Sequence, residues 1–297
     1  MRKSVLFGVT LLGLLVGGAW AQTSGGATMT GDFVETSDGA RPYYEVHGEG
    51  EPMVLIHGYP LSGKLFRDNV AALSAEYQVV TVDLRGFGNS ETPDALGAIA
   101  TYATDTLAVM DELGIDQAII AGMSMGGMTA LEMYRQAPER FSGLVLIDTT
   151  ARPAGTAEAG LWNASAVQAQ EPGGLARLGA FFTPDMLTGV TRTERPELVE
   201  YLGSVVGEAS VAGAVAGGVA LAERPDSRGT LAQITVPTLI LVGQEDSLTP
   251  FEVHQEMQAG IAGSALVIIP GAAHGAVLEA ADAANAAILE WAAGLPQ

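Results

Sequence analysis

The segment 122–126, Gly-Met-Ser-Met-Gly, places a serine between two glycines. A Gly-x-Ser-x-Gly pattern is typical of a sharp strand-to-helix turn that holds a nucleophilic serine in strained backbone geometry. The flanking residues fit this context, because 118–121 is an apolar run with strand character and 125–136 has helical spacing. The hydroxyl of Ser124 would then stand at a helix N-terminus, where the dipole stabilises developing negative charge. We therefore predict that Ser124 is a nucleophile.

A serine hydroxyl becomes an effective nucleophile only when a base removes its proton, and the chain offers four histidines for this role. His47 lies in an early strand, His57 ends a buried strand beside a glycine, and His254 is expected on the surface of a helix. His274 follows the last predicted strand, in a loop before the closing helix. In a parallel sheet this loop and the Ser124 turn share the carboxyl edge. His274 is therefore the predicted general base.

The imidazole of a general base needs a carboxylate that fixes its tautomer and stabilises its protonated form. Asp246 follows the predicted strand 238–242, and the chain order serine, aspartate, histidine agrees with that of hydrolases. Glu245 is adjacent but would point elsewhere on a tight turn. Asp148, at the end of the predicted strand 143–147, could also reach the histidine. We predict Asp246 as the orienting acid and keep Asp148 as its rival.

Acyl transfer also needs hydrogen-bond donors for the negative oxygen of the transition state. The residues His57-Gly58-Tyr59-Pro60 end another predicted buried strand. Backbone N–H groups from such a loop and from the residue after the nucleophile form an oxyanion hole, so we predict the N–H groups of Tyr59 and Met125. The alternative is a glycine-proline turn without a catalytic role.

Alternating strands and helices must position these residues. The strands are expected at 33–36, 43–46, 53–56, 78–82, 118–121, 143–147, 238–242 and 265–269, and the helices at 64–73, 102–113, 125–136, 250–257 and 276–291. This alternation predicts an α/β fold with a mostly parallel sheet and helices on both faces. For the helix at Pro250, Thr249 is the expected N-cap.

The alternation stops between residues 151 and 230. This segment is rich in Ala and Gly, and 175–182, 196–206 and 211–222 could each be helical. We predict a helical cap at 151–230, inserted into one sheet domain formed by 31–150 and 231–297; a disordered insert is the alternative, which the apolar content opposes. The cap residues Trp162, Phe181 and Phe182 either line an acyl pocket or pack the cap onto the sheet.

The N-terminus has the pattern of a signal peptide. Arg2 and Lys3 precede an apolar run at 5–16, and Ala19-Trp20-Ala21 predicts cleavage after Ala21, leaving a flexible leader at 22–30. The alternative is a membrane anchor, but the run is short for a span of about 20 residues. The mature protein is expected to be periplasmic or secreted.

Composition excludes several kinds of site and partner. Without cysteine the chain has no disulfide, thiolate metal site or cysteine nucleophile. A formal net charge of −20 opposes binding to nucleic acid and to anionic membranes. A small-molecule substrate is the expected partner, and the oligomeric state is not determined by the sequence.

Together these motifs resemble the α/β-hydrolase superfamily. The matching landmarks are 57–60, 83–90, 122–127, 243–246, His274 and Glu279. The resemblance implies an eight-stranded, mostly parallel sheet with an inserted helical cap, and structural roles for Asp83 and Arg85. Ser124 stands where dehalogenases and epoxide hydrolases have aspartate, which places the chain in the serine branch. Ser-Met-Gly-Gly and Ala-Ala-His are similar to 3-oxoadipate enol-lactonases and related esterases. Two features depart from this pattern: Ala281 replaces a frequent proline, and enol-lactonases are cytoplasmic.

The residues and the resemblance together predict a serine hydrolase that cleaves a carboxylic ester or lactone through an acyl-enzyme, with no cofactor and no metal. A perhydrolase or haloperoxidase that needs no cofactor, a carbon–carbon bond hydrolase and an amidase are alternatives that would use the same three residues. A non-catalytic binding protein on this scaffold is the alternative of another class.

Overall fold

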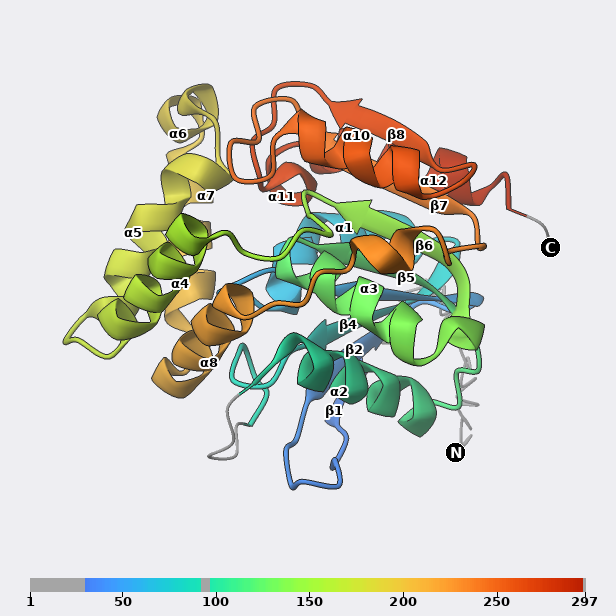
Figure 1. Cartoon of the computed structure of the whole chain (residues 1–297), viewed down its shortest axis with the longest axis horizontal. Helices are drawn as coiled ribbons and strands as arrows, with labels where there is room; N and C mark the ends of the chain where they lie inside the picture. Colours follow the sequence, from blue (N-terminus) through green and yellow to red (C-terminus); the bar gives the residue numbers. More distant parts are fainter. Residues whose placement is uncertain (1–29, 92–96, 296–297) are drawn as a thin grey trace, which may run out of the picture.

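The computed structural model describes residues 30–91 and 97–295 (Figure 1). The predicted signal peptide and the predicted leader up to residue 29 lie outside these residues. Thr30, the last residue of the predicted leader, already belongs to the first strand, which begins and ends three residues before its expected position.

One eight-stranded sheet forms the centre of the molecule. Its strands are β1 Thr30–Phe33, β2 Tyr43–His47, β3 Glu51–Ile56, β4 Tyr77–Asp83, β5 Ala118–Met123, β6 Phe141–Ile147, β7 Thr238–Gly243 and β8 Ala265–Ile269. They follow the order β1-β2-β4-β3-β5-β6-β7-β8; β1 and β2 are antiparallel and the remaining pairs are parallel. The predicted fold class is therefore confirmed.

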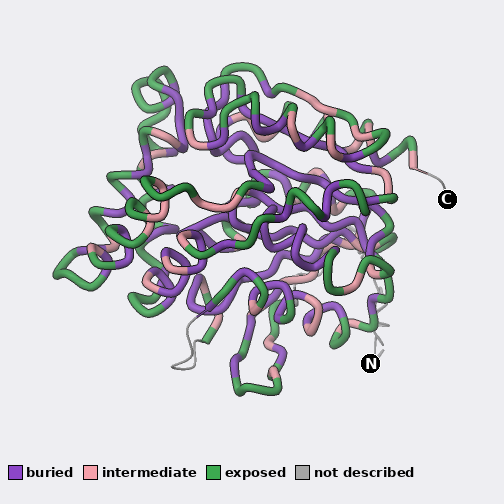
Figure 2. Tube along the Cα trace, in the orientation of Figure 1, coloured by how far each residue is buried: buried purple, intermediate pink, exposed green. Residues whose placement is uncertain are grey.

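Helices cover both faces of the sheet, so its central strands are buried on two sides (Figure 2). This explains why β3, β5 and β7 read as continuous apolar runs rather than as alternating ones. The core helices, with two short 3₁₀ turns, are η1 Gly63–Phe66, α1 Arg67–Leu73, α2 Ile99–Glu112, α3 Met125–Gln136, η2 Pro138–Arg140, α9 Arg228–Leu231, α10 Phe251–Gly260, α11 Ala276–Glu279 and α12 Ala281–Ala292. On one face α1 packs with α11 and α12, and on the other α3 packs with α2 and α9, and α9 packs with α10.

The segment of the chain that connects β6 to β7 contains five helices that form a separate layer, at the left of Figure 1. They are α4 Thr156–Ala169, α5 Gly174–Met186, α6 Gly189–Glu194, α7 Pro196–Gly207 and α8 Val211–Ala222. Within this layer, which we call the cap, α4 packs on α8 and α5 packs on α7. Among the described residues no single helix is long and apolar enough to cross a membrane; α7 and α8 reach that length only together, across a 96° bend.

Candidate active site

The turn between β5 and α3 carries Ser124 in a backbone conformation that side chains rarely adopt, with φ 52° and ψ −116°. Such strain persists only where the surroundings fix it. Here the Ser124 N–H donates to the Ile147 carbonyl at 2.9 Å, and the Ser124 carbonyl accepts from Thr149 Oγ1 at 2.6 Å. An added Cβ at Gly126 would lie 2.1 Å from the Ile56 carbonyl oxygen, so this close approach to β3 needs glycine.

The structure brings the three predicted residues of the triad together. His274 Nε2 lies 2.9 Å from Ser124 Oγ, and His274 Nδ1 lies 2.9 Å from Asp246 Oδ2. Asp246 and His274 are buried, and Ser124 is half-buried. Burial alone would raise the pKa of Asp246, but its contact with His274 and its hydrogen bonds with Thr249 lower it below the usual value. Asp246 is therefore held as an ion against the imidazole.

Thr249 supports Asp246, a role that the sequence reasoning missed. Its hydroxyl donates to Asp246 Oδ2 at 2.6 Å, and the N–H groups of Leu248 and Thr249 both donate to Oδ1 at 2.9 Å. The prediction of Thr249 as a helix N-cap is therefore wrong: α10 begins at Phe251, and the hydroxyl is used on the acid. An aspartate followed by a threonine three residues later is itself a signal for such a turn.

The cap holds the loop that carries the histidine. The His274 N–H donates to the Asp185 carbonyl at the end of α5, at 3.1 Å. The buried carboxylate of Glu279 accepts from the N–H of Ala273 at 2.6 Å and from the N–H of Thr188 at 2.8 Å, so it connects this loop to the cap. The sequence marked Glu279 only as part of a resemblance, because its partner Thr188 is distant in the chain.

The predicted oxyanion loop lies against the Ser124 turn. An added Cβ at Gly58 would lie 3.0 Å from Ser124 Cβ, which shows how closely the two segments approach. Among the described residues, the N–H groups of Tyr59 and Met125 have no hydrogen-bond acceptor, so both are free to bind a ligand oxygen. The Tyr59 hydroxyl donates to the Ala214 carbonyl of α8 at 2.9 Å and thereby joins this loop to the cap.

Two of the three cap aromatics named above lie next to Tyr59. Trp162 and Phe182 stack with ring centroids 5.6 Å apart, and each presents a ring edge or face to Tyr59 at about 6 Å. Phe181 is 48% exposed and packs edge-to-face on Phe182, with ring centroids 5.1 Å apart. The cap therefore places an aromatic wall beside the oxyanion loop, built by Trp162 and Phe182.

The other buried histidines have structural contacts. His57 Nε2 accepts from the Leu84 N–H at 3.0 Å, and burial lowers the pKa of His57 to about 4. His254 is not on a helix surface, as its position in the sequence indicated: it is fully buried, because α10 packs this side chain beneath the end of β6. Glu245 is exposed, and His274 faces Asp246 rather than Asp148.

Comparison with known proteins identifies the family. A model described as "alpha/beta hydrolase fold" matches residues 51–281. The chain belongs to the α/β-hydrolase family. It is 33% identical to the AB hydrolase superfamily protein YisY of Bacillus subtilis, across 88% of this chain and 98% of that protein. It is 32% identical to 3-oxoadipate enol-lactonase 2 of Acinetobacter baylyi, across 82% and 90%.

A solved structure of a thermophilic esterase from Thermogutta terrifontis has the same fold, with a TM-score of 0.85. The two sequences are 30% identical, and the match covers 91% of this chain and 100% of the esterase. This α/β-hydrolase is therefore similar over its core and its cap to proteins named as esterases and lactonases, and it is an enzyme of the hydrolase class.

Proposed function

We propose that this α/β-hydrolase cleaves a carboxylic ester or lactone by nucleophilic catalysis through an acyl-enzyme. The observation that carries the proposal is the unbroken contact from Ser124 Oγ through His274 to Asp246, with both hydrogen bonds at 2.9 Å. A hydroxyl, an imidazole and an ionised carboxylate in this order generate a nucleophile at neutral pH.

In the proposed reaction Ser124 Oγ attacks the carbonyl carbon of the substrate while its proton passes to His274 Nε2. The N–H groups of Tyr59 and Met125 bind the resulting oxyanion. His274 then gives the proton to the leaving alcohol, which departs and leaves the acyl group on Ser124. Water, deprotonated by His274, releases the acid and regenerates the serine.

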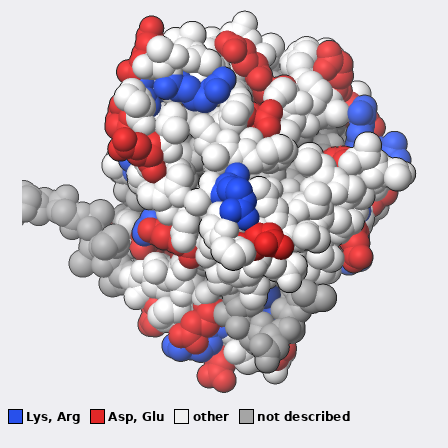
Figure 3. All heavy atoms as spheres, turned by 90° about the vertical axis from the view of Figure 1, so that its left-hand side faces the viewer, with Lys and Arg blue, Asp and Glu red and all other residues white. Residues whose placement is uncertain are grey.

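The surroundings of the site favour a substrate with an apolar acyl group. Trp162 and Phe182 stand beside the Tyr59 loop. On the cap side of the molecule, charged side chains are scattered between broad uncharged areas (Figure 3). The similarity to an enol-lactonase and an esterase supports the same class of substrate.

A fluorophosphonate probe tests the proposal, because it reacts covalently with an activated serine. We expect intact-mass labelling of the wild-type protein, no labelling of Ser124→Ala, and unchanged labelling of Ser142→Ala, which replaces an exposed serine in β6. An unlabelled wild type, or equal labelling of Ser124→Ala, would overturn the proposal. A panel of esters graded by acyl length, with lactones and with peroxide plus carboxylate, then identifies the preferred substrate.

A further inference from the structure

Asp148 is a buried carboxyl group that the reaction above does not use. It follows directly after β6 and has φ 44°. Among the described residues, Asp148 and Ser124 are the two that are not glycine and have a positive φ. Residues held in this region cost free energy and gather at functional sites. The strained backbone of Asp148, like that of the nucleophile Ser124, therefore needs a structural or functional reason.

The contacts of Asp148 join the two loops that carry the acid and the base. Its Oδ1 accepts from the N–H of Gly243 at 2.7 Å, three residues before Asp246. Its Oδ2 accepts from the N–H of Ala276 at 3.2 Å, two residues after His274. One carboxyl group thus joins the end of β7 to the start of α11, close in the chain to Asp246 and to His274.

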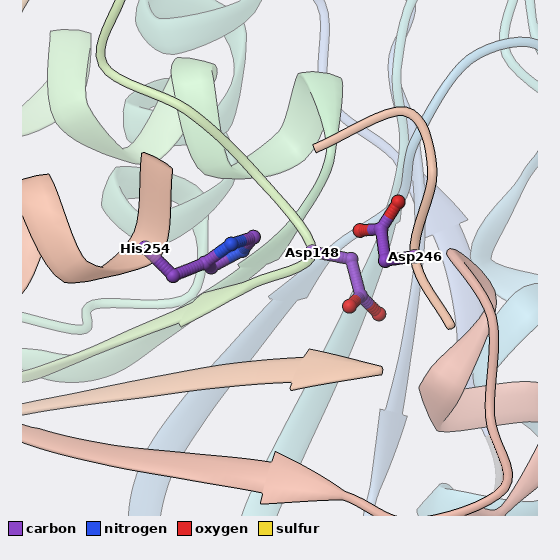
Figure 4. Close-up of side chains that lie close together, drawn as sticks. All are labelled: Asp148, Asp246 and His254. Atoms are coloured by element: carbon purple, nitrogen blue, oxygen red, sulfur yellow. The ribbon is translucent and has the colours of Figure 1, made fainter. Parts of the chain in front are cut away.

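The groups that face Asp148 make a second negative charge unfavourable there. Oxygen atoms of Asp148 and Asp246 and a ring nitrogen of His254 lie within 4.8 Å of one another (Figure 4). Burial lowers the pKa of His254 to about 4, so His254 is neutral, and His274 is already paired with Asp246. In the described part of the chain no Lys or Arg forms an ion pair with either aspartate.

Burial and the neighbouring negative charge of Asp246 raise the pKa of Asp148 well above its usual value, although its hydrogen bonds with the N–H groups of Gly243 and Ala276 act in the opposite direction. Asp246, by contrast, accepts hydrogen bonds from Thr249 and from His274 and stays ionised. Because these two adjacent carboxyl groups have such different hydrogen-bond donors, Asp148 is the protonated group and Asp246 is the ionised one.

A metal ion fits these three residues poorly. His254 Nε2 accepts from the Thr149 N–H at 3.1 Å, and Nδ1 donates to the Pro250 carbonyl, so neither ring nitrogen has a free lone pair. Both oxygens of Asp148 already face backbone N–H groups, which would repel a cation. A proton on Asp148 leaves its contacts with the N–H groups of Gly243 and Ala276 in place, because the oxygens of a carboxylic acid still accept hydrogen bonds.

We propose that Asp148 is a positioning residue of the triad: its carboxyl group remains protonated in the working enzyme, donates a hydrogen bond to Asp246 and ties the loop of Asp246 to the loop of His274. The proposal rests on the proposed function in taking Asp246 and His274 as acid and base. It implies that Asp148 and Asp246 together carry one negative charge rather than two beside the imidazole of His274. It also implies that Asp148 acts only through its neighbours, since its side chain is fully buried.

Infrared spectroscopy detects the proton directly, because the C=O stretch of a protonated carboxylic acid is separate from that of an ionised carboxylate. At about pH 8 we expect this band in the wild type, since ordinary carboxyl groups are ionised there. The band should be absent from Asp148→Asn and retained in Asp116→Asn, a control at an exposed aspartate. A wild type without the band, or a band that survives in Asp148→Asn, would overturn the proposal.

Kinetics of the two replacements test the positioning role. Asp148→Asn keeps a neutral donor and one acceptor and loses only one of the two contacts with backbone N–H groups, so we expect kcat to fall by no more than about threefold, with an unchanged pH midpoint on the acidic side of the kcat/KM profile. Asp148→Ala removes the hydrogen bonds, and we expect kcat to fall at least about tenfold with KM within about twofold. Each kcat is calculated per folded molecule, and near-ultraviolet circular dichroism gives the folded fraction.

A kcat for Asp148→Asn as low as that for Asp148→Ala would contradict the proposal. A shift of more than about half a pH unit in the acidic-side midpoint of kcat/KM for Asp148→Asn would also contradict it, because such a shift indicates that the replacement removed a negative charge. If Asp148→Ala does not fold, the infrared comparison of the wild type with Asp148→Asn decides. The infrared result does not depend on turnover. A wild type that fails to react with the fluorophosphonate would refute the proposed function, and the infrared band would still show whether Asp148 is protonated.

Discussion

The replacement Asp246→Asn changes one oxygen atom to an NH₂ group, and the structure determines where that group points. Asp246 Oδ1 accepts from two backbone N–H groups, those of Leu248 and Thr249. The amide oxygen must keep this position, because an NH₂ there would face two donors. The NH₂ group therefore occupies the place of Oδ2, 2.9 Å from His274 Nδ1.

An NH₂ group in that position donates to Nδ1 and places the imidazole hydrogen on Nε2. Nε2 faces Ser124 Oγ at 2.9 Å and can then no longer accept the serine proton. Loss of the correct tautomer in such a triad lowers kcat about 10⁴-fold, which at 1.36 kcal/mol for each factor of ten is about 5 kcal/mol of transition-state stabilisation. We expect a loss of this size.

The assay is kcat and kcat/KM for p-nitrophenyl acetate, with Glu245→Gln as the matched control. Glu245 is adjacent and exposed, so its replacement should leave kcat within about twofold. Retention of more than about a tenth of the wild-type kcat by Asp246→Asn would refute the tautomer argument. If the double variant Asp148→Asn/Asp246→Asn then lost that residual activity, Asp148 would be the group that supports the histidine.

Two further predictions concern the oxyanion loop and the pH dependence of stability. In Gly58→Ala the new Cβ would lie 2.7 Å from Met123 Sδ and 3.0 Å from Ser124 Cβ, displacing the Tyr59 N–H, so kcat should fall about 10²-fold. Gly229→Ala, where nothing lies within 4 Å, should leave kcat unchanged, and equal values for both variants would contradict this. Burial raises the pKa of Asp83 to about 6, so between about pH 4 and pH 6 the folded state binds more protons than the unfolded chain, and the free energy of unfolding falls as pH rises. The contribution is about 3 kcal/mol; urea unfolding should show it in the wild type and not in Asp83→Asn, and parallel pH curves would disprove it.

The sequence by itself determined the features that depend on near neighbours. Residue periodicity shows the alternation of buried strands and amphipathic helices, and it predicted a mostly parallel sheet with helices on both faces. Ser124 was recognisable because a strand, a glycine-flanked serine and a helix follow one another within a short segment. His274 was recognisable because few histidines compete and because strand ends share one sheet edge.

Only the tertiary structure decided the choices between residues that meet from distant parts of the chain. Asp148 and Asp246 both follow parallel strands, so sequence position does not separate them; the path of each loop places Asp246 on the imidazole and Asp148 behind it. His254 has a helical position that is compatible with exposure, and it is buried because α10 packs against the end of β6.

Thr249 shows the same limit at shorter range. Its neighbours Pro250 and Glu252 carry the usual signals of a helix start, yet its hydroxyl bonds to Asp246. Local propensity specifies which conformations a segment prefers, whereas the partner of a polar side chain depends on which groups folding brings within 3 Å or so. In this chain the nucleophile Ser124 could be predicted from neighbouring residues, whereas the environment that makes it reactive could not.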